Sequence, residues 1–429
     1  MDQSSKTATG PIGNVPVSPG DGVLSVAGAR DRILAKARVL EAKSLDLGAA
    51  LGRVLAEDVK AAGPVPPFPN SAMDGYAVRA SDVERASPSD PARLRVLGEV
   101  RAGYPPAQSV APGTAIRIMT GATIPDGADA VVRVEDTSEA DGTVDIRAAV
   151  GLGTSVRRAG SDLEPGDVIA RAGQLVTPGL IGVIAAAGRG SVRCIRRPVV
   201  LLLTTGDELR DAGEALEPGQ ITNTNRYSLR AAIEETGALV QDGGVARDDR
   251  EDLTARLEQA RRVDLVVSTG GVSMGAYDLV RPLLEDRDAV DFWQVALRPG
   301  KPLAFGSIHG VPLIGLPGNP VSALVGVELF VRPALLKMQG RTDLLRPRVA
   351  AITDEPLSSP PHLEQYFRGI ARSEAGKVRV RLTGDQGSHV LRSMAEANCL
   401  VIVPPGVGEI PAGAGVEIIP LAPIAEVPT

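Results

Sequence analysis

Two carboxylates stand directly after a continuous apolar run near the middle of the chain. Val199–Leu203 is typical of a strand that is buried on both faces, and it leads into Thr204–Glu208. Ligands of open α/β sheets bind at the carboxyl ends of strands, so Asp207 and Glu208 could hold a hard cation or a ribose hydroxyl there. A helix cap or an exposed turn is the alternative interpretation.

A glycine- and hydroxyl-rich segment, Ser268–Gly275, follows the next apolar run, Asp264–Val267. Its residues can turn successive backbone N–H groups into a concave nest for an anion. Asp278 comes soon after and could carry the metal that accompanies a phosphate. A flexible turn is the alternative, and the Walker pattern of phosphate-binding loops is absent from the sequence.

Cations gather at a third expected strand end, in Arg298-Pro-Gly-Lys-Pro302. Two positive charges on a turn stiffened by proline are pre-organised for an anion, although a polar surface loop would explain them too. Leu316–Ser322 places Asn319 as the N-cap and Pro320 at the first position of a helix. The free N–H groups at such a helix start bind anions readily, but ordinary capping is an adequate explanation by itself.

Four further motifs indicate only turns and strands when they are taken alone: Asn70–Tyr76, Arg117–Gly121, Tyr366–Gly369 and Gly384–Ser388.

Composition excludes several classes of protein. The formal net charge is −6 and no block of basic residues is present, so nucleic-acid binding is not expected. The most apolar helix candidate, Val321–Val331, contains Glu328 and is too short to span a bilayer, so no membrane segment is expected. Three scattered His and two Cys cannot build a common zinc site, and any metal should have oxygen ligands, as Mg²⁺ does. The two Cys also give no disulfide framework, which favours the cytoplasm.

The apolar pattern predicts several domains rather than one core. Residues 1–22 are rich in Ser, Thr, Pro and Gly and predict a disordered tail. A helix is predicted over 27–41, and short alternating runs over 63–156 predict a β domain. Over 196–343, apolar runs alternate with helical patterns, as in a doubly wound α/β domain with a mostly parallel sheet. Short strands over 344–429 predict a small C-terminal β-barrel or β-sandwich.

Six of these segments occur in an order that resembles a known family: Asn70–Ala77, Arg117–Ala122, Thr205–Leu209, Gly270–Gly275, Pro299–Pro302 and Leu316–Ser322. The chain resembles the molybdopterin molybdenumtransferases of the MoeA type, which include the gephyrin C-terminal domain, over nearly its whole length. The resemblance implies a transferase of molybdenum cofactor biosynthesis. It would insert molybdate into adenylated molybdopterin, release AMP and depend on Mg²⁺.

The resemblance also implies a multidomain α/β plus β fold. Residues 23–62 and 157–195 would form a discontinuous elongated domain, next to the β domain, the molybdopterin-binding α/β domain and the C-terminal β-barrel. It implies a homodimer in which the β domain of one subunit completes the site on the α/β domain of the other. The molybdopterin adenylyltransferase is a further expected partner.

Roles carried over by position complete the expected site. Glu208, Asp278 and Asp248 (or Asp249) would hold Mg²⁺, and Gly270, Gly271, Ser273 and Gly275 would cradle phosphates. The molybdate and substrate contacts would come from Arg298, Lys301, Pro317, Asn319, Ser322, Arg368 and Ser388. Asp74 and Thr120 would reach in from the partner subunit and would act in catalysis with Glu208, Asp278 and Lys301.

Some positions depart from the family pattern. Arg298 stands where many members have Lys, which keeps the charge but changes its geometry. Ser161 and Thr222-Asn223 stand where acidic residues occur in some members. Two alternative functions share this fold: adenylylation of molybdopterin, which belongs to short single-domain relatives, and scaffolding of receptors. The three extra domains argue against the first, and the intact set of carboxylates and cations favours an enzyme over the second.

Overall fold

The structure is a computed structural model that describes residues 23–247, 250–270 and 290–426. The chain divides into two compact units. The larger unit contains Met1–Glu41 and Arg196–Thr429, and the smaller contains Ala42–Ile195. The expected tail over 1–22 lies outside the described residues.

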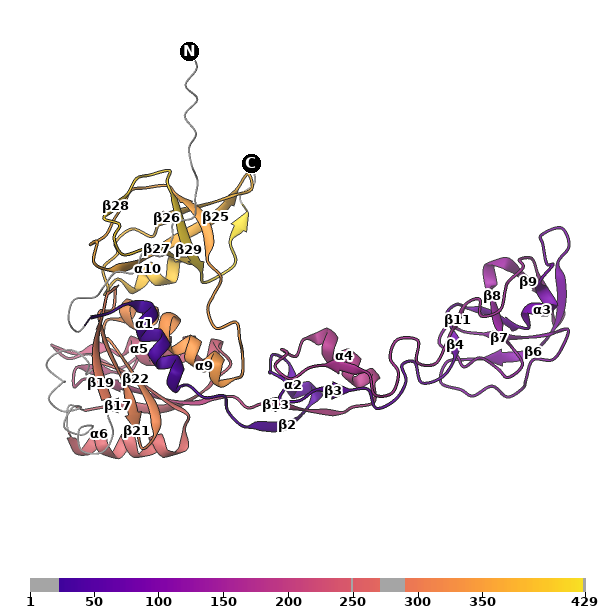
Figure 1. Cartoon of the computed structure of the whole chain (residues 1–429), viewed down its shortest axis with the longest axis horizontal. Helices are drawn as coiled ribbons and strands as arrows, with labels where there is room; N and C mark the ends of the chain where they lie inside the picture. Colours follow the sequence, from indigo (N-terminus) through magenta and orange to yellow (C-terminus); the bar gives the residue numbers. More distant parts are fainter. Residues whose placement is uncertain (1–22, 248–249, 271–289, 427–429) are drawn as a thin grey trace, which may run out of the picture. The chain divides into compact units, whose positions relative to one another are not determined.

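The larger unit contains a seven-stranded sheet (Figure 1). Its strands, in spatial order, are β1 (Val23–Leu24), β19 (Val290–Val295), β21 (Pro302–Ile308), β22 (Val311–Leu316), β18 (Leu265–Thr269), β14 (Val199–Thr205) and β17 (Leu239–Ala246). The strands β17, β14, β18 and β22 are mutually parallel, whereas β21 runs antiparallel to β22 and to β19. The predicted α/β fold is therefore confirmed.

Helices cover both faces of this sheet, as the aliphatic run of β14 predicts. Val200 and Leu202 belong to one core cluster, and Leu201 and Leu203 belong to a second cluster. The first cluster includes residues of α1 (Val26–Lys36), α5 (Thr224–Glu235), α8 (Pro320–Gly326) and α9 (Arg332–Met338). The second includes residues of α6 (Arg250–Leu257) and of the 3₁₀ turn Glu258–Arg262.

The helical region that follows Asn319 contains Pro333, and proline kinks or ends helices. A π-helical turn, Val327–Val331, separates α8 from α9 just before that residue. Proline has no N–H to continue the regular ladder, so the change of hydrogen-bond pattern coincides with it.

The first helix is shorter than its apolar pattern predicts, because α1 ends at Lys36 rather than near residue 41. Val26, Ala29 and Ile33 are buried in the core of the larger unit. This helix therefore packs with the α/β sheet, whereas the sequence had placed 23–62 together in the discontinuous domain. Spacing alone shows that a helix has an apolar face, but not which core covers it.

Five strands of the C-terminal region close into a barrel, as predicted. They are β25 (Glu364–Glu374), β26 (Lys377–Leu382), β23 (Val349–Thr353), β29 (Gly415–Pro420) and β27 (Cys399–Val403), which pairs back with β25. The short strand β20 (Leu297–Arg298) follows β19 in the chain and pairs with β25. It therefore connects the α/β sheet to the barrel.

The smaller unit contains a six-stranded sheet, formed in spatial order by β8 (Ala130–Arg133), β5 (Gly75–Val78), β7 (Thr114–Ile118), β6 (Ala92–Val100), β10 (Thr143–Ile146) and β9 (Thr137–Ala140). Its other part is built from two separate stretches of chain. There β2 (Ala42–Asp46) pairs with β13 (Ser191–Ile195), β3 (Val59–Lys60) pairs with β12 (Val168–Ala170), and the helix α4 (Pro178–Ala186) packs nearby. This part is discontinuous, as expected.

Candidate functional site

Three neighbouring parallel strands of the larger unit end at the same edge of the sheet. Thr204 of β14 pairs with Thr269 of β18, and Thr269 pairs with Leu316 of β22. A cavity of about 980 Å³ lies at these carboxyl ends and is also lined by barrel residues from 363–368 and 386–389. The motifs that follow the three apolar runs are thus brought to one place.

Of the described residues of the larger unit that the sequence proposed for the site, all but Asp207 line this cavity: Glu208, Gly270, Arg298, Lys301, Pro317, Asn319, Ser322, Arg368 and Ser388. Six other proposed residues lie outside the described residues: Asp248 and its alternative Asp249, Gly271, Ser273, Gly275 and Asp278.

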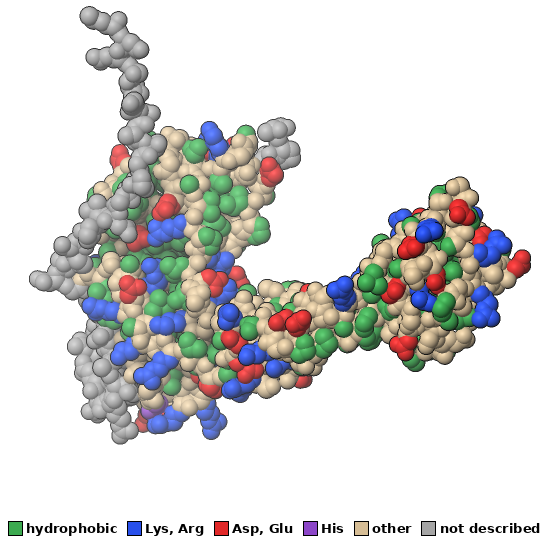
Figure 2. Space-filling model, turned by 45° about the vertical axis from the view of Figure 1, so that its right-hand side comes forward, with side chains coloured by type: hydrophobic (Ala, Val, Ile, Leu, Met, Phe, Trp, Pro, Cys, Tyr) green, Lys and Arg blue, Asp and Glu red, His purple; other side chains and the backbone are tan. Residues whose placement is uncertain are grey.

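Three cations line the cavity. Among the described residues, Arg298, Lys301 and Arg368 form no ion pair with a carboxylate. On the face of the molecule seen in Figure 2, basic and acidic side chains are interspersed. Together with the net charge of −6, this indicates that the positive charge at the cavity is local. Such an arrangement suits an anionic ligand.

Arg368 is the most confined of the three, with only 1% of its surface exposed. Its Nε donates to Ser393 Oγ at 3.0 Å, and its Nη2 donates to the Gly387 carbonyl at 3.0 Å. Burial lowers the pKa of Arg368 to about 10, although the charge of Asp385 opposes this shift. Arg368 stays protonated at neutral pH, so a buried positive charge faces the cavity with only neutral hydrogen-bond partners.

The start of α8 meets the barrel loop at the cavity. The Val321 N–H donates to the Ser388 carbonyl at 3.2 Å, and Ser322 beside it is buried. Asn319 is the N-cap, but its side chain makes no capping hydrogen bond to this helix. The capping role that the sequence left open for Asn319 is therefore not realised by its side chain, which leaves it available to a ligand.

A polar residue that sequence reasoning missed ties two of the strand ends together. Asn225 Nδ2 donates to Thr269 Oγ1 at 2.9 Å and to the Gly318 carbonyl at 2.8 Å, and Thr269 Oγ1 donates to the Pro317 carbonyl at 2.9 Å. The segments that follow β18 and β22 are thus held by one amide. The available signal was the polar run Thr222–Asn225 at the start of a helix, which an N-cap alone does not require.

Gly270 allows the backbone to approach closely at the end of β18. Its φ is +82°, and a Cβ there would lie 2.6 Å from the Thr205 carbonyl oxygen. Any other residue would push apart the ends of β14 and β18, so this glycine is needed for the shape of the cavity.

Glu208 places a carboxylate at this edge of the sheet, where it lines the cavity. Its carboxylate lies over Gly206, where an added Cβ would be 2.5 Å from Glu208 Oε2, and it has no hydrogen bond or ion pair among the described residues. Across those residues, no group of three or more His, Cys, Asp and Glu is placed to hold a metal ion. The other two expected ligands, Asp248 and Asp278, lie outside the described residues, so Glu208 is the one expected metal ligand among the described residues.

Asp74 and Thr120 are brought together in the smaller unit, 46 residues apart in the chain. The backbone N–H and the Oγ1 of Thr120 both donate to Asp74 Oδ1, each at 2.7 Å. These two hydrogen bonds, the backbone one first, lower the pKa of Asp74, and Arg117 adds to the effect. Asp74 is thus an exposed carboxylate that is ionised at neutral pH and fixed in orientation.

Comparison with known proteins identifies three regions of one family. A model described as "MoeA N-terminal region (domain I and II)" matches residues 24–188, "Probable molybdopterin binding domain" matches 201–337, and "MoeA C-terminal region (domain IV)" matches 350–421. The "Molybdopterin molybdenumtransferase 2" of Mycobacterium tuberculosis is 40% identical over 382 residues, which cover 87% of this chain and 94% of that protein. The chain belongs to the molybdopterin molybdenumtransferase family.

Further members of the family agree over a similar length. The molybdopterin molybdenumtransferase of Haemophilus influenzae is 37% identical over 380 residues, which cover 88% of this chain and 93% of that protein. Among solved structures, a "molybdopterin biosynthesis moea protein" from Pyrococcus horikosii matches with a TM-score of 0.78 and 33% identity, and the match covers 94% of this chain and all of that chain. As a member of this family the chain is a transferase, and its multidomain fold is that of the family.

Within the described part of the chain, no helix combines the length and the apolar composition needed to cross a membrane.

Proposed function

We propose that the chain inserts molybdenum from molybdate into adenylated molybdopterin at the cavity beside β14, β18 and β22. Family membership supports a role in molybdenum cofactor biosynthesis. The finer reaction, in which the phosphoanhydride is cleaved, AMP leaves and the dithiolene sulfurs bind molybdenum, rests on the resemblance and on the chemistry of the cavity.

The observation that carries the proposal is the buried guanidinium of Arg368, which forms no ion pair among the described residues although the charge of Asp385 acts on it. A buried charge is tolerated when it is paired, and a small dianion would supply the missing partner. Arg298, at the end of β20, and Lys301, on the turn between β20 and β21, bring two more charges to the same cavity. These three cations can hold both the oxyanion and the phosphates of an adenylated pterin.

The described residues can bind and orient the two substrates. Charge-assisted hydrogen bonds from Arg368 and Arg298 would fix the molybdate oxygens, because guanidinium groups match planar pairs of acceptors. Asn225 holds the segments that contain Gly270 and Pro317 through its hydrogen bonds, and the backbone of these two residues would border the phosphates. Both substrates would then lie in one cavity, so the reaction would take place between two bound anions that no longer have to meet in solution.

Magnesium dependence is also proposed, with Glu208 as one ligand. A bound Mg²⁺ would neutralise charge on the phosphates.

A homodimer is also proposed, because the resemblance to the family implies one. The fixed, exposed Asp74–Thr120 pair is the part of the smaller unit that would complete a partner's cavity. A cytoplasmic location agrees with the two cysteines, Cys194 and Cys399, which are buried and free.

Adenylylation of molybdopterin by the same α/β fold is the competing function. The family matches extend over 24–188 and 350–421, well beyond the α/β domain, and so favour insertion over adenylylation.

Complementation tests the proposal in a cell. The gene is introduced into a bacterial strain that lacks molybdenum insertion, and the activity of a resident molybdoenzyme is measured. We expect the wild-type chain to restore that activity and Lys301→Ala to restore much less. If both restore nothing although both are expressed and folded, the proposed function is wrong.

A further inference from the structure

The segment that carries Glu208 is long and has few bonds of its own to the sheet. It leaves β14 at Gly206 and reaches α5 at Asn223, and it pairs internally through β15 (Leu209–Arg210) and β16 (Ile221–Thr222). The Ile221 N–H donates to the Glu208 carbonyl at 2.9 Å, so the two arms of the segment hold each other. Its start is attached to β17 by a long hydrogen bond from the Gly206 N–H to the Ala246 carbonyl, at 3.3 Å, and its end is attached to β14 by a hydrogen bond from Asn223 Nδ2 to Thr204 Oγ1, at 2.8 Å.

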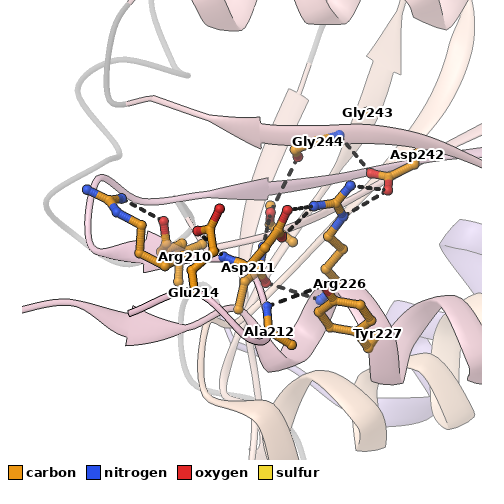
Figure 3. A network of polar contacts seen from close by, with 12 residues as sticks. Arg210, Asp211, Ala212, Glu214, Arg226, Tyr227, Asp242, Gly243 and Gly244 are labelled. Atoms are coloured by element: carbon orange, nitrogen blue, oxygen red, sulfur yellow. Dashed lines mark hydrogen bonds and ion pairs between the residues drawn. The ribbon is translucent and has the colours of Figure 1, made fainter. Parts of the chain in front are cut away.

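Arg226 provides the stronger attachment (Figure 3). It lies in the first turn of α5, and its guanidinium lies between two carboxylates. Nε and Nη2 contact Asp242 Oδ2 of β17 at 2.8 and 2.6 Å, while Nη1 donates to both oxygens of Asp211 on the Glu208 segment. One arginine thus joins this segment to the last strand of the sheet.

Further hydrogen bonds hold each of the two chain segments that Arg226 connects. Asp242 also accepts a hydrogen bond from the Gly244 N–H at 2.8 Å. On the other side, the Ala212 N–H donates to the Tyr227 hydroxyl at 3.3 Å. Burial raises the pKa of Asp242, but the hydrogen bonds from Arg226 and Gly244 outweigh burial, so its pKa is lowered and the pair is ionised at neutral pH.

We infer that Arg226 is a positioning residue that, through Asp211, holds the Glu208 carboxylate in the cavity. Among the described residues that carboxylate has no partner of its own, so the backbone of its segment alone sets its place. The effect of Arg226 on turnover rests on the proposed function. Its effect on the order of the segment is independent of the proposed function, because that effect needs no substrate.

The test compares Arg226→Lys and Asp211→Asn with Arg230→Met. A lysine keeps the charge but cannot bridge two carboxylates as the planar guanidinium does. Asp211→Asn removes one carboxylate and leaves the ion pair between Arg226 and Asp242. It therefore shows whether Arg226 holds the segment even if Arg226→Lys folds poorly. Arg230 is the matched control, because it lies on the same helix and donates to Glu234 at 2.9 Å, and although its charge acts on Asp242, among the described residues it forms no hydrogen bond or ion pair with Asp211.

Amide hydrogen exchange and kinetics are both measured. We expect exchange over 207–222 to quicken about tenfold in the two test variants, and kcat for AMP release to fall by about tenfold. The KM for molybdate should change less than about twofold, since the cations lie on other elements, and Arg230→Met should match the wild type in all three.

Two results would overturn the inference. Unchanged exchange in both test variants would show that Arg226 does not hold the segment, whatever the enzyme does. Faster exchange with an unchanged kcat would show that Glu208 does not depend on this attachment. A wild-type protein that releases no AMP would instead count against the proposed function, and the exchange measurement would still decide whether Arg226 holds the segment.

Discussion

Replacing Arg368 by methionine should separate binding from stability. Arg368 is almost fully buried, and its guanidinium donates to Ser393 Oγ and to the Gly387 carbonyl. Methionine keeps an apolar stem of similar length and removes the charge. We expect the variant to fold and to lose most of its affinity for molybdate.

The magnitudes follow from the burial of the charge. A fall of its pKa from the ordinary arginine value to about 10 corresponds to about 3 kcal/mol, by which the folded state disfavours the charged form. Because the folded pKa is the lower one, this penalty is fully present at every pH below it and disappears only at higher pH. The substitution relieves the penalty but loses two charged hydrogen bonds, worth about 1.5–3 kcal/mol each. The free energy of unfolding should therefore fall by no more than about 3 kcal/mol.

Binding has no such compensation. One lost charge-assisted hydrogen bond to the oxyanion, at about 1.5–3 kcal/mol, weakens molybdate binding by about 10- to 100-fold. Isothermal titration with molybdate and chemical denaturation measure the two effects. Arg372→Met is the control, because Arg372 lies on the same strand but pairs with Asp354 and Glu374 outside the cavity. If Arg368→Met binds molybdate as well as this control does, the cavity is not the oxyanion site.

Three further predictions concern the remaining charges. Lys301→Ala should weaken molybdate binding more than AMP binding, because its turn serves the small oxyanion, and equal losses in titrations with each ligand would indicate a general phosphate contact instead. Thr120→Val should raise the pKa of Asp74 only part of the way to its ordinary value, since the backbone N–H remains as a donor. The folded pKa is the lower one, so the stabilisation is present at neutral pH and is lost as pH falls through that pKa, and an unchanged titration by NMR would exclude a role for the hydroxyl. Doubly tagged heterodimers of Asp74→Ala and Lys301→Ala should each hold one intact site of two, so a randomly mixed population, about half heterodimers, should regain roughly a quarter of wild-type activity. Purified heterodimers as inactive as either mutant alone would refute a shared site.

The strand ends of the α/β domain were predictable from sequence because each combines a two-sided apolar run with a polar motif. Val199–Thr205 is an example, since both of its faces are buried in separate core clusters. The antiparallel strand Pro302–Ile308 was missed, because Gly306 and Ser307 interrupt its apolar pattern. Glycine and serine are both compatible with a strand, so pairing with the neighbouring strands determined the structure of this segment.

Burial and long-range pairing account for what the sequence could not predict about the site. Tyr366–Gly369 indicates only a strand, and nothing local shows that Arg368 would be buried with no ion pair to another described residue. The hydrogen bonds between Asp74 and Thr120 and the bridge from Arg226 to Asp211 and Asp242 depend on segments that meet only in the folded chain. Motif spacing therefore located the cavity, whereas the electrostatics of its arginines required the structure.

The most direct test of the central claim is the stoichiometry of molybdenum insertion in vitro. Purified protein is incubated with adenylated molybdopterin and Mg²⁺, with and without molybdate, and AMP and pterin-bound molybdenum are quantified together. We predict molybdate-dependent AMP release with one molybdenum bound per AMP, and loss of both in Lys301→Ala. AMP release without molybdenum in the pterin product, or molybdenum insertion without AMP release, would contradict the account.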